Sequence, residues 1–274
     1  MSYSLANITK DESNQFVLPL IPKNKRGFAS RFSVSDLFSC MLHKLKTGCQ
    51  WHKLFIDLEG FKPHFSWQSV YCFYKKWCQA DVFKNLYNAH LAAKAKLLDK
   101  SNLNLDGTQT LVKKSAESAR YQNRKKGRTS NVLIMTDAAG IPISIGPIIA
   151  GNHHDLYQVV PQFAAMSRQL NELGISVKGV MLNTDKGFDC KALRRAILRR
   201  GMIPNIKENV RNRKKTKRGK KRLFDQDAYK NRFVNERCFA WLDSFRTLLI
   251  RFDKHDSKWL NWHYIAAFLI LLKV

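Results

Sequence analysis

The sequence is poor in acidic residues. Its 274 residues include 21 Asp and Glu against 48 Lys and Arg, which gives a formal net charge of +27. A surface with so few carboxylates repels itself and attracts polyanions. The charge balance therefore favours a polyanionic partner.

Closely spaced cysteine pairs and long apolar runs are also missing. None of the six cysteines forms a Cys-x-x-Cys pair, so neither a zinc ribbon nor a redox motif is supported, and we expect free thiols in a reducing cytosol. Residues 1–14 are polar and have no apolar core, so we expect no secretory signal. The most apolar run, Trp259–Leu272, is shorter than the roughly 20 residues of a membrane-spanning helix. We therefore expect a cytoplasmic protein without a membrane partner, and a buried helix at 259–272.

The first hundred residues favour helices. Apolar and aromatic residues recur three and four positions apart, and Gly48, Gly60 and Pro63 punctuate the pattern. Such a stripe is typical of a helix core, but Lys75 and Lys76 beside it also suit an element that enters a DNA groove. The stripe consists of Trp67, Val70, Tyr71, Tyr74 and Trp77.

The pattern changes to alternating strands and helices after residue 100. The sequence predicts a hairpin of residues 131–136 and 141–149, with Gly140 in its turn. It also predicts one continuous helix over residues 229–252. Together these patterns indicate an α/β fold with a mixed sheet. The further predictions are strands at 102–106, 177–182 and 203–206, and helices at 161–173 and 191–200.

Three acidic residues stand at or near the ends of predicted elements. Asp106 closes the first strand, Asp185 follows a later strand, and Glu236 lies in the first turns of the late helix. Side chains at the carboxyl ends of neighbouring strands meet at one edge of a sheet, and carboxylates there suit Mg²⁺ or Mn²⁺. Each acid also has an ordinary interpretation, because an Asp at a strand end caps turns and Glu236 could pair with Arg232 one helical turn earlier.

Six sequence blocks occur in an order that resembles the DDE transposases of bacterial insertion sequences, in particular the IS-five-like group. The resemblance implies a ribonuclease H-like catalytic domain whose acid triad falls on Asp106, Asp185 and Glu236. It also predicts a division of the chain into a helical region, 1–98, and a catalytic region, 99–274. We expect the helical region to recognise DNA ends, because Lys75 and Lys76 flank its aromatic stripe. The blocks are Asn104–Thr108, Gly127–Asn131, Asp137–Pro142, Gly151–Asp155, Asp185–Asp189 and Tyr229–Leu242.

The function implied by this resemblance is DNA cleavage and strand transfer at the ends of an insertion sequence. The triad would hold two Mg²⁺ ions, with Mn²⁺ as an alternative. The partners would be the terminal inverted repeats and target DNA, bound by a homodimer at the bacterial nucleoid. Two alternatives stay open: a metal-dependent nuclease that never joins DNA, and a catalytically silent DNA-binding protein.

Several basic residues are candidates for phosphate contacts. We expect Arg128, Lys186, Arg232 and Arg237 to position phosphates. Residues 207–222 carry ten Lys or Arg and one acid, so they predict an exposed arm that grips the DNA backbone or, alternatively, a solvated tether. The arm's candidate contacts are Arg213, Lys214, Lys215, Lys217 and Arg218.

Accessory roles are also implied by the resemblance, for Tyr229, His154 and Asp155. The pair His154 and Asp155 could instead be a loop histidine with a capping aspartate. Seven positions after Glu236 the family has a basic residue, whereas this sequence has Asp243. Arg246, three positions further on, is our candidate to replace it on the same helix.

Overall fold

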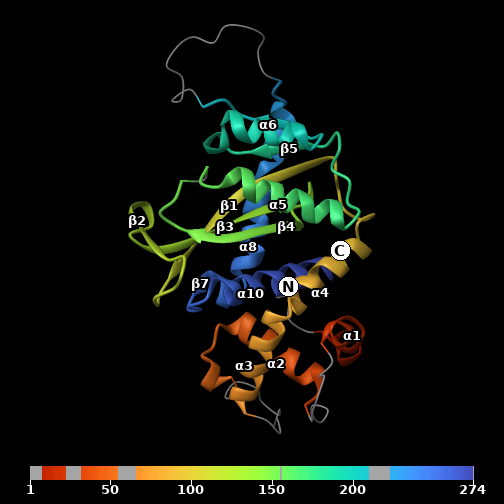
Figure 1. Cartoon of the computed structure of the whole chain (residues 1–274), viewed down its shortest axis with the longest axis vertical. Coiled ribbons are helices and arrows are strands. Elements are labelled where there is room, and N and C mark those ends of the chain that lie inside the picture. The colour runs from red at the N-terminus through yellow and green to blue at the C-terminus, as the bar shows by residue number, and fades with distance from the viewer. Residues whose placement is uncertain (1–7, 23–31, 55–65, 155, 210–222, 274) are drawn as a thin grey trace. The chain divides into compact units, whose positions relative to one another are not determined.

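The computed structural model describes residues 8–22, 32–54, 66–154, 156–209 and 223–273 (Figure 1). The chain forms two compact units. Unit 1 comprises residues 1–90, 112–117 and 242–273, and unit 2 comprises residues 91–111 and 118–241. The functional boundary at residue 98 stays a prediction, and the packing units do not follow it, because the last 30 or so residues pack with the N-terminal helices.

Unit 1 is mainly helical and is built around aromatic side chains. Tyr74 stacks on Trp262 with ring centroids 4.3 Å apart, and its hydroxyl donates to the carbonyl oxygen of Lys258 at 2.6 Å. Val70 and Trp77 are buried beside it, so the predicted stripe does form a helix core. The elements are α1 (Lys10–Phe16), η1 (Leu18–Leu20), α2 (Val34–Thr47), η2 (Trp51–Lys53), α3 (Trp67–Gln79), α4 (Val82–Ala93), α9 (Arg246–Leu249), β7 (Ile250–Arg251) and α10 (Asp256–Leu271).

The C-terminal helix α10 is buried along most of its length, as its apolar sequence predicts. His263 within it is 2% exposed, and burial lowers its pKa to about 4, so the ring stays neutral at physiological pH. None of the helices in the described ranges combines the length and apolarity that a bilayer crossing requires.

Unit 2 contains a mixed sheet. Its strand order is β2-β3-β1-β5-β6, and β4 pairs with β3. β1 runs antiparallel to β3 and parallel to β5, which in turn runs parallel to β6. The strands are β1 (Asn102–Val112), β2 (Arg120–Gln122), β3 (Gly127–Thr136), β4 (Pro142–Ala150), β5 (Met181–Thr184) and β6 (Ile203–Ile206). The helices are η3 (Asn123–Lys125), α5 (Val159–Glu172), η4 (Lys186–Phe188), α6 (Lys191–Arg199), α7 (Gln226–Lys230), η6 (Asn231–Phe233) and α8 (Val234–Asp243).

The two faces of this sheet differ in chemistry. Because side chains alternate along a strand, Asn104 and Asp106 share one face of β1, and the buried Leu103 and Leu105 share the other. Helix α5 contacts β4, whereas α7 contacts β5 and β6. Figure 1 shows α5 on one side of the sheet and α8 on the other. The predicted α/β class, a mixed sheet with helices, is confirmed, and the ribonuclease H-like assignment stays a prediction.

Three predicted elements are wrong in extent. The strand predicted at 177–182 is β5, Met181–Thr184, so only its last two residues were placed correctly. The first strand continues to Val112, so Asp106 lies in the middle of β1 and not at its end. Antiparallel pairing with β3 extends the strand through Gly107 and the polar residues after it, because tertiary pairing overrides weak local propensity. The single helix predicted over residues 229–252 is broken into α7, η6, α8, α9 and β7.

Gly151 is the residue of unit 2 least able to carry a side chain. A Cβ atom there would overlap the hydroxyl and the carbonyl of Thr129, to which the Gly151 amide donates at 3.0 Å. We expect Gly151→Ala to lower the free energy of unfolding by about 3 kcal/mol or more, because the β3–β4 pair must open. Chemical denaturation measures this loss. Gly127→Ala is the matched control, because its Cβ would meet the side-chain end of Leu111 at 3.1 Å and a backbone oxygen, that of Lys125, only at 3.7 Å. Equal losses in both variants would contradict the explanation.

Candidate active site

Asp106 lies on β1, and Asp185 directly follows the neighbouring parallel strand β5. The β1–β5 register pairs Leu105 with Thr184, and each aspartate is the residue that follows its member of this pair. The two carboxylates therefore begin from adjacent positions on the polar face of the sheet. This is the juxtaposition expected of two acids that share a cation.

Two side chains, Tyr229 from α7 and Arg232 from η6, reach these carboxylates. Arg232 Nη1 lies 3.0 Å from Asp106 Oδ2, with the two side chains 25% and 21% exposed. The other oxygen of Asp106 accepts from the amide of Gly107 at 2.8 Å. Tyr229 donates its hydroxyl to Asp185 Oδ1 at 3.5 Å, and the Arg232 guanidinium lies 5.9 Å from the centre of the Tyr229 ring. The alternative in which Arg232 pairs with Glu236 is not the arrangement found.

The Tyr229 hydroxyl keeps its proton at neutral pH. Burial, and then the negative charge of Asp185, raise the pKa of Tyr229 above its ordinary value. The protonated hydroxyl can donate a hydrogen bond to a carboxylate or to a phosphate oxygen. Tyr229 is thus placed for the accessory role that the sequence suggested, which stays a prediction.

Glu236 lies in the first turn of α8, as predicted, and is exposed. Among the residues that the structure describes, no three His, Cys, Asp or Glu side chains are grouped closely enough to hold a metal ion. The structure thus brings two members of the triad to neighbouring strands, and the convergence of Glu236 with them stays a prediction. Catalytic contacts are often looser without substrate than with it.

A row of buried asparagines lies next to the two aspartates on the same face. The registers pair Asn104 with Asn183 and Asn183 with Asn205, so the row crosses β1, β5 and β6. All three are at most 1% exposed. Asn183 Nδ2 donates to Asn104 Oδ1 at 2.9 Å, and Asn205 Nδ2 donates to Asn183 Oδ1 at 2.8 Å.

This asparagine row also binds the segment that carries Tyr229 and Arg232. Asn183 and Asn205 donate at 2.8 Å to the carbonyl oxygens of Ala228 and Asp225, respectively. The Asp225 amide donates back to Asn205 Oδ1 at 2.9 Å. Further along, Asn231 Nδ2 donates to Asn102 Oδ1 at 3.1 Å. The row therefore sets where α7 and η6 lie on the sheet.

Helix α8 is fixed to the β3–β4 hairpin. The buried Asn235 accepts from the Thr136 hydroxyl at 2.8 Å. Arg237 donates to the carbonyl of Ala139 and lies 5.4 Å from the Trp241 ring. The Arg237 guanidinium thus already has a structural partner in the hairpin turn, and its phosphate role stays a prediction.

The other predicted contacts are spread over the surface of unit 2. Lys186 is exposed on η4, directly after Asp185, and Arg128 is exposed near the start of β3. His154 is exposed, and its Nδ1 accepts from the amide of Leu156 at 3.2 Å. The remaining predicted contacts lie outside the described residues: Asp155, Arg213, Lys214, Lys215, Lys217 and Arg218.

The proposed replacement for the basic residue expected at position 243 fails. Helix α8 ends at Asp243, and Arg246 begins the separate helix α9. The three-residue spacing places two side chains on one face only within a continuous helix, so Arg246 does not take that place.

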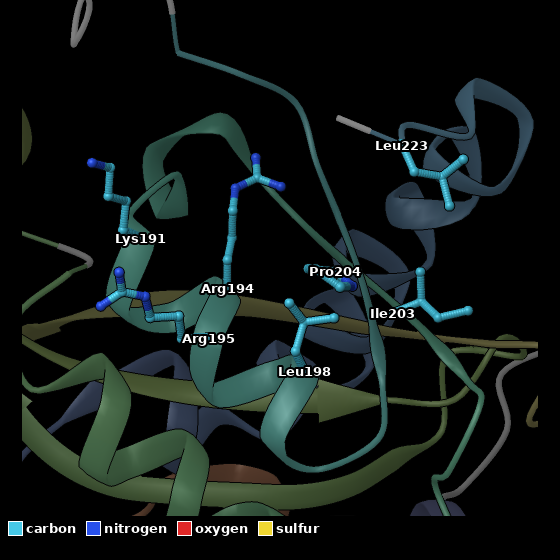
Figure 2. A pocket seen from close by; sticks show the side chains of 7 residues that line it. All are labelled: Lys191, Arg194, Arg195, Leu198, Ile203, Pro204 and Leu223. Atoms are coloured by element: carbon cyan, nitrogen blue, oxygen red, sulfur yellow. The ribbon is translucent and has the colours of Figure 1, made fainter. Parts of the chain in front are cut away.

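A pocket between α6 and β6 has neither aspartate among its lining residues (Figure 2). Arg194 on its wall is already engaged, because it binds Asp189 at 2.9 Å and the carbonyl of Ile206 at 2.7 Å. This pairing makes Asp189, the second acid of its sequence block, a structural residue. The pocket is lined by Lys191, Arg194, Arg195, Leu198, Ile203, Pro204 and Leu223.

The asparagine row is the part of the site that sequence reasoning missed. The signal was present, because Asn102, Asn104 and Asp106 alternate in β1, and Asn183 and Asp185 alternate after them. A period of two places each set on one face of its strand. Polar residues repeated on the face of a predicted catalytic acid therefore indicate a buried network.

The donor set fits a hard divalent cation. Asp106 and Asp185 supply carboxylate oxygens from adjacent strands, which are the ligands that Mg²⁺ and Mn²⁺ prefer. The guanidinium of Arg232 supplies positive charge to Asp106 at 3.0 Å, and the metal-binding role of Asp106 stays a prediction.

Comparison with known proteins agrees with this geometry. The family model described as DDE superfamily endonuclease matches residues 105–271, which is more than half of the chain. The chain belongs to this family. The match includes Asp106, Asp185 and Glu236, and the predicted kinship with DDE transposases is confirmed, whereas the IS-five-like subgroup stays a prediction.

One curated relative is a putative transposase for insertion sequence element IS402 from Burkholderia cepacia. It is 32% identical over 123 residues, which are 44% of this chain and 52% of the relative. This chain thus spans about half the length of that DDE relative. Among solved structures, the Mos1 transposase paired-end complex with left transposon end matches with 13% identity and a TM-score of 0.30, over 90% of this chain and 79% of that one. The Mos1 mariner paired-end complex with Mn matches with 12% identity and a TM-score of 0.30, over 94% and 82%.

Proposed function

We propose that the chain is a transposase that cleaves DNA at the ends of an insertion sequence and joins the freed 3′ ends to target DNA. The observation that carries this proposal is that Asp106 on β1 and Asp185 directly after the adjacent parallel strand β5 lie side by side, within a member of the DDE family. The net charge of +27 supports a polyanionic substrate.

The triad Asp106, Asp185 and Glu236 would hold two Mg²⁺ or Mn²⁺ ions. Such ions, when bound, supply the charge that activates a hydroxyl nucleophile and stabilises the leaving oxygen. Arg232 pairs with Asp106 at 3.0 Å, and a cation bound by Asp106 would leave this guanidinium available to a scissile phosphate. Tyr229 and Lys186 lie beside Asp185, where a hydroxyl and an ammonium can orient phosphate oxygens.

The proposed partners are double-stranded DNA with terminal inverted repeats and a separate target duplex. Joining two ends at one place requires two active sites, so the DNA-bound form is proposed to be a homodimer. End recognition is proposed for residues 1–98 and catalysis for residues 99–274. Since α3 and α10 pack together within unit 1, recognition should be tested by substitutions in the full chain and not with fragments.

A strand-transfer assay tests the function. The full chain is mixed with Mg²⁺, a labelled duplex that carries its element's own ends, and a supercoiled target plasmid. We expect labelled DNA joined to the plasmid, in addition to shortened labelled strands. Shortened strands without joined products would establish the nuclease alternative, and binding without either product would establish the silent DNA-binding alternative.

A further inference from the structure

A basic hairpin extends from the sheet of unit 2, as Figure 1 shows at β2. We call residues 120–128 the β2–β3 finger; it comprises β2, η3 and the first two residues of β3. Residues 118–131 contain five Lys or Arg and no Asp or Glu. The finger thus concentrates positive charge on a short projecting segment. Its basic residues are Arg120, Arg124, Lys125, Lys126 and Arg128.

The basic side chains of the finger face solvent. All five are exposed, and no ion pair within the described part of the chain involves Lys125, Lys126 or Arg128. Tyr121 is 59% exposed and lies directly opposite Arg128 in the β2–β3 pairing, so the two side chains share one face. A tyrosine hydroxyl and cationic side chains together are typical donors to DNA phosphates.

Charge on an edge strand has a second explanation, which is protection against pairing with another chain. Only Arg120 and Tyr121 of this set belong to β2 itself, however, and Arg124, Lys125 and Lys126 lie in the connecting turn, beyond the paired backbone. Edge protection does not account for cations in the turn. It also does not account for a large exposed aromatic ring on the edge strand.

The finger lies at a defined place relative to Asp106. The β1–β3 register pairs Asp106 with Ile134 and Leu111 with Thr129, which adjoins Arg128 and pairs with Arg120 at the base of the finger. Five residues of β-strand span about 17 Å. Phosphates along one strand of duplex DNA are spaced about 3.4 Å apart along the helix axis. This interval therefore corresponds to about five base pairs.

We propose that the β2–β3 finger binds the sugar-phosphate backbone of duplex DNA about five base pairs from the phosphate at Asp106 and Asp185. The five-base-pair position rests on the proposed function, because that function places the scissile phosphate at the aspartates. The duplex contact itself does not depend on catalysis. It adds a DNA-binding surface separate from the carboxylates.

The test uses a triple variant of the full chain, Lys125→Gln, Lys126→Asn and Arg128→Gln. Asn is chosen at position 126 because this residue has a φ of 48°, which Asn tolerates. Binding to a fluorescent duplex is measured at several salt concentrations. We expect the slope of log affinity against log salt to fall by about 0.9 for each lost contact, so by roughly 2 to 3 in total.

A second triple variant removes the same charge elsewhere on unit 2: Arg168→Gln, Lys178→Gln and Arg199→Gln. These residues are exposed on α5, after it and on α6. We expect a slope change of less than 1. Equal slope changes in the two variants would show a general charge effect and overturn the proposal. An unchanged slope in the finger variant would also overturn the proposal. If that variant then self-associated, the basic residues would serve to protect the edge strand β2 against pairing with another chain.

Hydroxyl-radical footprinting on a duplex cleaved by the wild type locates the contact. We expect the finger variant to lose protection about five base pairs from the cleavage point and to retain it elsewhere. Protection lost at another distance would overturn the placement. If the wild type binds but does not cleave, the proposed function fails while the salt slopes still decide whether the finger binds DNA.

Discussion

Asp185→Asn is expected to reduce DNA cleavage by about 10³-fold or more, while DNA binding stays unchanged or becomes tighter. The substitution keeps the size of the side chain but removes the charge of a proposed metal ligand, and metal stabilisation of developing charge contributes several kcal/mol. The same change removes a negative charge that repels phosphate. Single-turnover cleavage and fluorescence anisotropy measure the two quantities separately.

Asp227→Asn is the matched control for this prediction. Asp227 is exposed on α7 and pairs with Lys230 at 2.8 Å. Asp227→Asn therefore removes one negative charge from the same unit without changing Asp106 or Asp185. We expect cleavage by this variant to remain within a few-fold of the wild type. Wild-type cleavage by Asp185→Asn, or an equal loss in both variants, would show that Asp185 does not act on the reacting phosphate.

The accuracy of the sequence predictions depended on whether the structural signal was local. The β3–β4 hairpin was predicted correctly because its turn needs a positive φ, and Gly140 has a φ of 82°. The strand at 203–206 and the helix that begins at Lys191 were also found, since Gly201 between them marks the break. In each of these elements, the residues that determine the structure lie within a few positions of one another.

Long-range pairing determined what the sequence could not show. β1 extends past Gly107 because β3 supplies a partner, and this moved Asp106 from a strand end to a strand middle. Likewise, Arg232 has Glu236 four residues away, but it pairs with Asp106, 126 residues earlier in the chain. The break in the late helix belongs to the same class, because segments with one continuous apolar period pack in two different units.

The position of Arg232 and Tyr229 depends on side chains that do not themselves touch the aspartates. The segment 225–231 has its carbonyl oxygens bound by asparagine amides from β5 and β6. Because these asparagines are buried in the sheet, their hydrogen bonds fix the position of the 225–231 backbone relative to β5 and β6. Apolar packing alone would leave that segment free to slide. The asparagine row thus connects the register of the sheet to the placement of the site.

Asn183 is the centre of this row, and Asn183→Leu should have a large effect on stability. The buried amide donates to Asn104 Oδ1 and to the carbonyl of Ala228, and leucine leaves both acceptors without this donor. A buried group left without its partner costs about 1–3 kcal/mol. We therefore expect the free energy of unfolding to fall by roughly 2 to 6 kcal/mol, as measured by urea denaturation of the full chain.

Hydrogen exchange distinguishes loss of this anchor from general weakening of the fold. If the asparagine row fixes the segment, amides of residues 225–233 should exchange faster in Asn183→Leu than those of β3 and β4. Asn171→Leu, which changes an exposed residue near the end of α5, should alter stability by no more than about 0.5 kcal/mol. Uniform acceleration across the sheet would mean that Asn183 supports the core as a whole. Unchanged stability would mean that the side-chain hydrogen bonds of Asn183 contribute nothing to the free energy of unfolding. Apolar contacts would then be what places Arg232 beside Asp106.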